Sequence, residues 1–221
     1  MLLEDKVIVI SGVGPGMGQS LARIAAREGA KVASGARNQA FLDRVADDII
    51  ADGGAVVARS TDVTDAGQCA ALAQAALDAF GRIDGLVNSA YIHGNWTTVD
   101  QADPADWLKV IDVNCLGALR MAQAVFPVMK AQGGGAIINV STMSTVNPFP
   151  GEGGYASGKG ALNVLTRHMA KDFGPHGIRV NATRMGWIGG KPVYDWIDRE
   201  VAAGRNRDEV AGEITARIPL G

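Results

Sequence analysis

Short runs of valine, isoleucine and alanine alternate along the chain with longer segments of helical periodicity. Several of these runs are apolar on both faces, as in strands that are buried on both sides of a sheet. The expected strands are residues 6–11, 31–35, 55–60, 85–89, 136–141 and 178–183. The expected helices are residues 16–28, 39–51, 66–80, 104–131 and 155–173. This order predicts an α/β fold with a doubly wound parallel sheet in three α/β/α layers.

The composition fits one soluble globular domain. The chain has 221 residues, of which 47% are hydrophobic, and no repeat or low-complexity linker divides it. We therefore expect residues 1–221 to form a single domain. Its 21 basic and 23 acidic side chains form no run of one sign, so a nucleic-acid partner is not expected.

Targeting and metal-binding signals are not found in the sequence. No apolar run approaches the roughly 20 residues that span a bilayer, and the first residues do not resemble a secretory signal. We expect a cytoplasmic protein without a membrane partner. The cysteines Cys69 and Cys115 are too few for a disulfide framework, and His93, His168 and His176 lack ligand spacing, so no metal is expected.

A glycine-rich turn, Ser11-Gly-Val-Gly-Pro-Gly-Met-Gly18, joins the first expected strand to the first helix. Glycines let a backbone approach a pyrophosphate, and a helix N-terminus offers it free N–H groups. The turn lacks the G-K-[ST] of a P-loop and departs from strict G-x-G-x-x-G, so a simple tight turn is the alternative. Its expected cofactor contacts are Gly12, Pro15, Gly16, Met17 and Gly18. Ligands bind doubly wound sheets at the carboxyl ends of the strands, here after strands one, four, five and six.

The residues after the second expected strand bear on the choice of cofactor. An NAD site commonly has an acidic residue there for the ribose 2′-hydroxyl, but this chain has Ala36 and Arg37. An arginine offers a fork of donors that suits a 2′-phosphate. The sequence therefore favours NADP, with NAD as the alternative if Arg37 is only a solvated surface residue.

Three groups of polar residues are candidates for catalysis. Tyr155 and Lys159 are four residues apart on one helix, so the lysine charge, together with the positive nicotinamide of a bound dinucleotide, is expected to lower the pKa of the tyrosine toward the working pH. A run of hydroxyl residues around Thr142 ends the fifth strand, where one of them could polarise a substrate oxygen. Asn114 lies on the apolar stripe of the long helix 104–131, where it is either functional or a hydrogen-bonded core residue.

The chain resembles the short-chain dehydrogenase/reductase family over essentially its whole length, with the motifs in family order. The matching motifs are Gly12-x-x-x-Gly16-x-Gly18 for the cofactor turn, Asp62-Val63 for the adenine contact, Asn88-Ser-Ala90 for N-N-A-G, Asn114 for the catalytic asparagine, and Tyr155-x-x-x-Lys159 for the catalytic pair. After the sixth strand, Gly186 and Ile188 are expected cofactor contacts, although Trp187-Ile-Gly-Gly190 stands in place of the family's common threonine.

The resemblance implies a Rossmann-like fold and an NAD(P)-dependent oxidoreductase that acts on a small alcohol or ketone. It implies that Tyr155 exchanges the proton with the substrate oxygen, that Lys159 holds the cofactor ribose, and that Asn114 positions Lys159 through a water. It also implies a homo-oligomer, a tetramer or dimer, built through residues 107–131 and 158–173. Residues 189–217 resemble the helical lid that shapes the substrate pocket.

Several positions depart from the family pattern. Thr142 stands where the family usually has serine, so Ser141 or Ser144 could polarise the substrate instead. Tyr91 replaces the last glycine of N-N-A-G, and Met185 replaces the proline of the P-G pair. The chain ends at Gly221, where members usually continue through another helix and a seventh strand, so we expect an exposed sheet edge. For His93, after the fourth strand, a surface role is favoured over substrate contact.

Two alternatives to a working oxidoreductase can be weighed. The first is a dinucleotide-binding sensor or scaffold with impaired catalysis, suggested by Thr142, Met185 and the chain end. Retention of Tyr155, Lys159 and Asn114 argues against it. The second is a methyltransferase with a similar glycine loop, which would normally have an acidic residue where this chain has Arg37.

Overall fold

The computed structural model describes residues 1–216, apart from the side chains of residues 191 and 192. Six parallel strands form one sheet in the order β3-β2-β1-β4-β5-β6, which reverses direction between β1 and β4. The strands are β1 (Val7–Ser11), β2 (Lys31–Ala36), β3 (Ala55–Ser60), β4 (Gly85–Asn88), β5 (Gly135–Thr142) and β6 (Ile178–Met185). The predicted doubly wound parallel sheet is confirmed, with each strand within two residues of its expected bounds.

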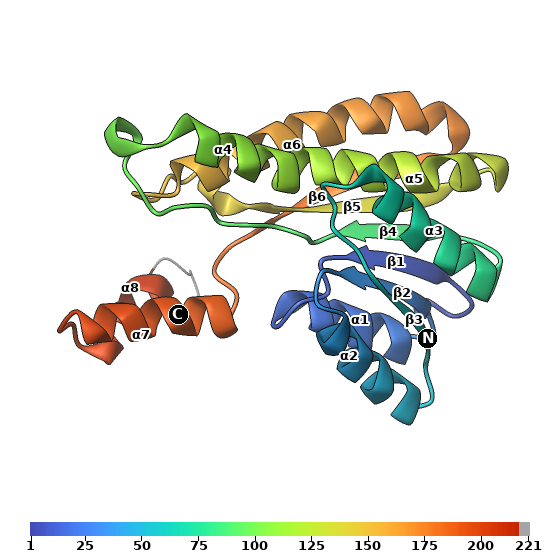
Figure 1. The fold of residues 1–221 in the computed structure, drawn as a ribbon, viewed down its shortest axis with the longest axis horizontal. Helices are drawn as coiled ribbons and strands as arrows, with labels where there is room; N and C mark the ends of the chain where they lie inside the picture. Colours follow the sequence, from blue (N-terminus) through green and yellow to red (C-terminus); the bar gives the residue numbers. More distant parts are fainter. Residues whose placement is uncertain (217–221) are drawn as a thin grey trace.

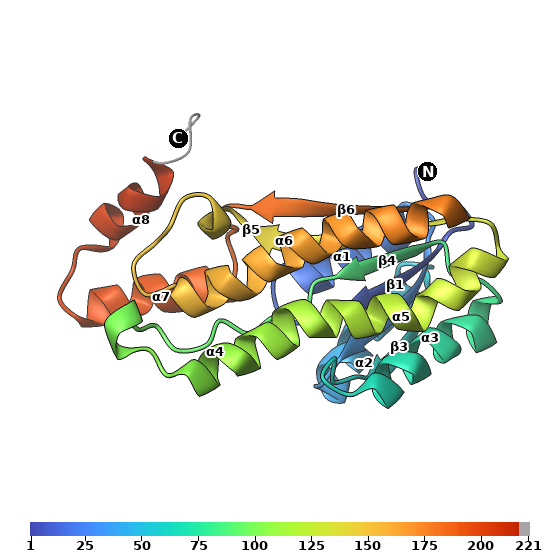
Figure 2. The same cartoon turned by 90° about the horizontal axis from the view of Figure 1, so that it is seen from above.

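Helices cover both faces of the sheet and give three layers (Figure 1). Two of them, α1 (Met17–Arg27) and α2 (Gln39–Ala51), lie on one face. The other face carries α3 (Ala66–Phe80), α4 (Pro104–Ile111), α5 (Gly117–Ala131) and α6 (Gly153–Phe173), with α4 and α5 running beside α6 (Figure 2). Short 3-10 turns are η1 (Val99–Gln101), η3 (Met143–Thr145) and η4 (Gly174–His176).

Each face of the sheet has its own apolar core. Val9, Leu86 and Ile137 pack with residues of α3, α5 and α6 on one side. Ile10 and Val32 pack with residues of α1 and α2 on the other. Neighbouring positions of a strand point to opposite faces, so Val9 and Ile10 enter different cores. This explains why the strands have apolar residues at consecutive positions.

The helix predicted over residues 104–131 is found, but it is not α-helical throughout. A π-helical turn, η2 (Asp112–Leu116), separates α4 from α5 and contains Asn114. The amide of Asn114 is bonded to the backbone of Ile92, which belongs to the loop after β4. Such a turn adds one residue within a single turn of a helix, a change too local for periodicity over a long segment to resolve.

The last two helices form a separate layer beside the carboxyl end of the sheet (Figure 1). They are α7 (Lys191–Ala202) and α8 (Arg207–Thr215), and they pack on each other through Ile197, Val210 and Ile214. This pair confirms the predicted helical lid, whose last residue, 217, lies outside the described residues together with the chain end at 221.

Among the described residues, strand β6 is at the end of the sheet, and its residues Arg179, Asn181 and Thr183 are exposed. Among residues 1–216, no helix is both long and apolar enough to cross a membrane.

Candidate active site

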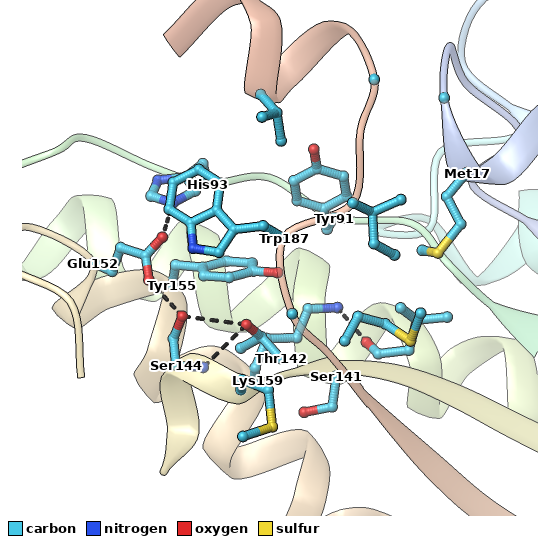
Figure 3. Close-up of a pocket in the computed structure, with 18 of the residues that line it drawn as sticks. Met17, Tyr91, His93, Ser141, Thr142, Ser144, Glu152, Tyr155, Lys159 and Trp187 are labelled. Atoms are coloured by element: carbon cyan, nitrogen blue, oxygen red, sulfur yellow. Dashed lines mark hydrogen bonds and ion pairs between the residues drawn. The ribbon is translucent and has the colours of Figure 1, made fainter. Parts of the chain in front are cut away.

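A cavity of about 410 Å³ opens at the carboxyl end of the sheet. Its lining comes from the loops after β1, β4, β5 and β6, together with the start of α6 and the lid (Figure 3). These are the four loops where the sequence predicts function. The expected site residues that line the cavity are Gly12, Pro15, Gly16, Met17, Gly18, Thr142, Tyr155, Lys159, Gly186 and Ile188.

The glycine turn forms one wall of this cavity and is tightly packed on its protein side. A Cβ atom at Gly12 would lie 2.2 Å from the backbone nitrogen of Ala90, and one at Gly18 would lie 2.2 Å from the Gly12 carbonyl oxygen. A Cβ atom at Gly14 or Gly16, by contrast, would meet no atom within 4 Å. The turn therefore presents backbone atoms, without side chains, to the open space at the start of α1, as binding of a pyrophosphate requires.

Lys159 lies at the floor of the cavity and is only 2% exposed. Its ammonium donates a hydrogen bond of 2.7 Å to the carbonyl oxygen of Val140 in β5. Burial lowers the pKa of Lys159 to about 8, although the nearby Cys115 raises it slightly. The lysine is held in place by the strand end that also carries the hydroxyl residues of the site.

Tyr155 lies one helical turn before Lys159, with its ring in the cavity (Figure 3). Burial raises the pKa of Tyr155 to about 12; Tyr91 and Glu152 add to the rise, and a hydrogen bond with Thr142 opposes it. Lys159 does not contribute to this shift. In the protein alone, the pKa of the tyrosine is therefore raised, and desolvation is the largest cause.

The hydroxyl residues at the end of β5 differ in their surroundings. Thr142 is hydrogen-bonded with Tyr155 and lies 3.2 Å from the hydroxyl of Ser144. Ser141 points away from Tyr155 (Figure 3), and its buried hydroxyl has no partner among the described residues. Strand alternation separates these two neighbours, so Thr142 is the hydroxyl that faces Tyr155.

Two cavity residues have roles that the sequence analysis did not assign. Glu152 accepts a hydrogen bond of 2.5 Å from the Ser144 hydroxyl, and its other oxygen lies 3.3 Å from Nε2 of His93. His93 is stacked between Trp96 and Tyr155, with ring centroids 4.1 Å and 4.8 Å away. The prediction of a surface role for His93 is therefore wrong. No sequence spacing links it to Glu152, which is 59 residues away.

Aromatic rings form the outer wall of the cavity. They come from the loops and the lid, and they are Tyr91, Trp96, Phe149, Trp187 and Trp196. Trp187 is within 6 Å of both Phe149 and Trp196, at 5.9 Å and 5.1 Å between ring centroids. The lid therefore closes over an apolar chamber in which Glu152 and Lys159 are the charged side chains at the described lining.

Other expected site residues lie around the cavity but do not line it. Asn114 exchanges two hydrogen bonds with the backbone of Ile92, at 2.8 and 2.9 Å, so its side-chain amide is not free to bind Lys159 directly. Asn88 is buried between β1 and β5, where it bonds Ser11 and Asn139. Ala90 contributes the backbone against which Gly12 packs.

The remaining expected residues lie near the ends of β2 and β3. Asp62 accepts hydrogen bonds from the backbone and hydroxyl of Thr64, which are the main reason that its pKa is lowered, and the charge of Arg37 lowers it further. Val63 packs against Gly117 at the start of α5. Arg37 itself is exposed. The structure thus brings Arg37 near Asp62, outside the main cavity.

Comparison with known proteins identifies relatives along nearly the whole chain. The family model for short chain dehydrogenases matches residues 6–194. A 3-oxoacyl-[acyl-carrier-protein] reductase of Thermotoga maritima is 35% identical over 222 residues, which cover 100% of this chain and 85% of the relative. A 2-(S)-hydroxypropyl-CoM dehydrogenase of Xanthobacter autotrophicus is 33% identical over 99% of this chain and 84% of its own length.

Solved structures agree with the sequence relatives. A levodione reductase superposes with a TM-score of 0.90 at 29% identity, covering 98% of this chain and 84% of that one. A 7α-hydroxysteroid dehydrogenase, solved with NADH and 7-oxo glycochenodeoxycholic acid, gives a TM-score of 0.83 at 31% identity over 90% of this chain and 78% of the other. The six-stranded sheet, the cavity at its reversal point and these matches lead to one conclusion: the chain belongs to the short-chain dehydrogenase/reductase family, whose members are Rossmann-fold oxidoreductases.

Proposed function

We propose that this protein is an NADP-preferring alcohol dehydrogenase or ketone reductase in which Tyr155 is the general acid and base. The observation that carries the proposal is the meeting of Tyr155, Thr142 and Lys159 with the glycine turn in one cavity. The relatives named as dehydrogenases and reductases support the same class of reaction.

The residues present fit a nicotinamide dinucleotide. The open side of the glycine turn can take a pyrophosphate, because a Cβ atom at Gly14 or Gly16 would have no other atom within 4 Å. The buried ammonium of Lys159 is placed to hold ribose hydroxyls. When bound, such a dinucleotide supplies or accepts the hydride.

The chain's own residues handle the proton at the substrate oxygen. In reduction the phenol of Tyr155 donates a proton to the carbonyl oxygen, and in oxidation the phenolate accepts one from the alcohol. Thr142 adds a second hydrogen-bond donor at the same oxygen, where negative charge develops in the transition state. Because burial raises the pKa of Tyr155 to about 12 in the protein alone, the positive charge of an oxidised nicotinamide is needed to favour the phenolate.

Asn114 and Arg37 have supporting roles in this proposal. The side-chain amide of Asn114 is occupied by Ile92, so a water-bridged path to Lys159 begins at the backbone of the π-helical turn. Arg37 is exposed beyond the end of β2, where its guanidinium can bind a 2′-phosphate.

A binding titration and one variant test the proposal. NADPH and NADH are titrated by reduced-nicotinamide fluorescence, and ketones and alcohols are then screened with the cofactor that binds. Tyr155→Phe is expected to lose at least about a hundredfold in turnover while its NADPH affinity stays within about threefold of the original. An unchanged turnover in Tyr155→Phe would refute the mechanism. Binding of NADPH without any turnover would instead support the sensor or scaffold alternative.

A further inference from the structure

Glu152 is a buried acid whose carboxylate does not cap its own helix. It occupies the N-cap position of α6, but its carboxylate accepts no capping hydrogen bond there. The residue is 8% exposed, and its two oxygens contact Ser144 and His93. A carboxylate in this position is costly to bury unless its partners satisfy it, so the donors and acceptors around it are constrained.

The direction of the hydrogen bonds between Glu152 and Thr142 follows from counting hydrogens. A hydroxyl has one hydrogen to donate and two lone pairs to accept. Ser144 gives its hydrogen to Glu152 at 2.5 Å. The oxygen of Ser144 can then only accept, and it accepts from Thr142 at 3.2 Å. While Glu152 is ionised, the hydrogen of Thr142 is thus directed away from the substrate.

Protonation of Glu152 reverses the direction of each hydrogen bond from Glu152 through Ser144 to Thr142. The carboxyl hydrogen is donated to Ser144, and Ser144 donates its own hydrogen to Thr142. The two lone pairs of Thr142 then accept from the hydroxyl and from the backbone N–H of Ser144, which lies 3.2 Å away. The hydrogen of Thr142 is then no longer given to Ser144 and is directed to the side of Tyr155 and the substrate oxygen.

We propose that Glu152 is a positioning residue that acts through Ser144, and that its protonated form turns the Thr142 hydroxyl toward the substrate oxygen. This inference rests on the proposed function, because it concerns the oxygen that Thr142 polarises. A donor at that oxygen stabilises the charge that develops in the transition state. Carbonyl reduction is therefore faster when Glu152 carries a proton.

His93 fixes the orientation that this mechanism needs. In the tautomer that carries its hydrogen on Nε2, His93 donates it to the facing Glu152 oxygen at 3.3 Å, which leaves the other oxygen of the acid to carry the proton toward Ser144. A glutamine at position 152 would for the same reason turn its oxygen to His93 and its NH₂ to Ser144. It would then imitate the protonated acid. The other titratable residues at the cavity are Tyr91, Tyr155 and Lys159, and Tyr155 is the one whose pKa the charge of Glu152 raises.

The test compares the pH profiles of kcat/KM for reduction of one ketone with NADPH. In the unmodified protein, kcat/KM is expected to be about tenfold higher at the acid end of the profile than at the alkaline end, the size of effect expected for one hydrogen bond at the reacting oxygen. Glu152→Gln is expected to keep the high value through this pH range. Glu4→Gln, an exposed residue before β1 at the opposite edge of the sheet, is the matched control and keeps the original profile.

A second variant separates the proposed route from a general charge effect. Ser144→Ala removes the acceptor that competes for the Thr142 hydrogen, so it is also expected to abolish the fall of kcat/KM with pH. This variant provides the test if Glu152→Gln is unstable. In the Ser144→Ala background, Glu152→Gln should change nothing further. Two results would overturn the role of Glu152. One is a fall of kcat/KM with pH that persists in Glu152→Gln. The other is an effect of Glu152→Gln on kcat/KM that is equally large with Ser144 present and in the Ser144→Ala background.

A titration without substrate gives an independent readout. Ultraviolet difference spectra of the cofactor-free protein follow ionisation of the tyrosines, and Glu152→Gln should lower the pKa of Tyr155 because it removes a negative charge. An unchanged titration would contradict the electrostatic effect of Glu152 on Tyr155. Tyr155→Phe as active as the unmodified protein would refute the proposed function itself. An active enzyme whose pH profile is unaffected by Glu152→Gln refutes only this inference.

Discussion

At the residue scale, the site combines groups whose protonation states are set by burial. Desolvation raises the pKa of Tyr155 to about 12 and lowers the pKa of Lys159 to about 8. Both shifts favour the neutral side chain and therefore oppose the charge pair that the proposed chemistry uses. The protein thus keeps two destabilised ionisable groups at the end of β5, a pattern common at functional sites.

The first prediction at this scale concerns the stability cost of Lys159. Its pKa is lower in the folded than in the unfolded chain, so the unfolded chain binds more protons between about pH 8 and 10 and stability from this group rises with pH. Lys159→Met should therefore raise the free energy of unfolding at pH 7 by about 2 kcal/mol, after loss of the bond to Val140. Urea unfolding of both proteins at pH 7 and pH 9 measures this increase in the free energy of unfolding, which should be smaller at pH 9. A stability loss at pH 7 would contradict it.

The second prediction concerns the recognition of a 2′-phosphate by Arg37. Arg37→Ala should weaken NADPH binding by about tenfold or more, because a charge-assisted contact is lost, and change NADH binding by less than about twofold. Fluorescence titration measures both affinities. Arg27→Ala, an exposed arginine at the end of α1, is the control. Equal losses for the two cofactors would show that Arg37 does not read the phosphate.

At the scale of elements, strand ends and helix starts position the reacting groups. The end of β5 provides both the carbonyl of Val140, which holds Lys159, and the hydroxyl of Thr142. The helix α6 provides Tyr155 and Lys159 from successive turns, while the π-helical turn η2 places Asn114 against the loop after β4. The glycine turn holds the start of α1 against that same loop.

The glycine turn is tightly packed on one side and open on the other. We therefore expect substitutions on its two sides to differ in their effects on stability and on cofactor binding. Gly18→Ala places a Cβ atom against a backbone oxygen and should lower the free energy of unfolding by about 1–3 kcal/mol. Gly14→Ala meets no atom within 4 Å and should leave stability nearly unchanged, yet its methyl group intrudes on the open side of the turn. Urea unfolding and NADPH titration of both variants measure the difference. A Gly14→Ala protein that binds NADPH normally would argue against pyrophosphate binding at this turn.

At the scale of the whole molecule, the helices on one face remain partly uncovered. Leu108 of α4 is 66% exposed and Val164 of α6 is 48% exposed, on helices that run side by side (Figure 2). Large apolar side chains grouped on neighbouring helices are typical of an interface between subunits. We propose that copies of the chain associate through α4, α5 and α6.

Charge placed on this face should break the association. Leu108→Glu is expected to shift the protein to a smaller species in analytical ultracentrifugation, because a buried charge at an interface is unpaired. Ile50→Glu is the matched control, since Ile50 is 58% exposed on α2 at the opposite face of the sheet. A Leu108→Glu protein that sediments like the unmodified one would place the interface elsewhere or refute self-association.

The sequence by itself determined the order of strands and helices, the glycine turn and the edge of the sheet where the site lies. These features follow from local patterns, because apolar periodicity and glycine spacing act within one or two elements. Tertiary structure decided what no local pattern contains: the π-helical turn at Asn114, the place of His93 on Tyr155, and the chain from Glu152 to Thr142. It also showed that burial raises the pKa of Tyr155 in the protein alone. The physical reason is that burial and hydrogen-bond direction depend on neighbours from distant parts of the chain, which only the packed molecule brings together.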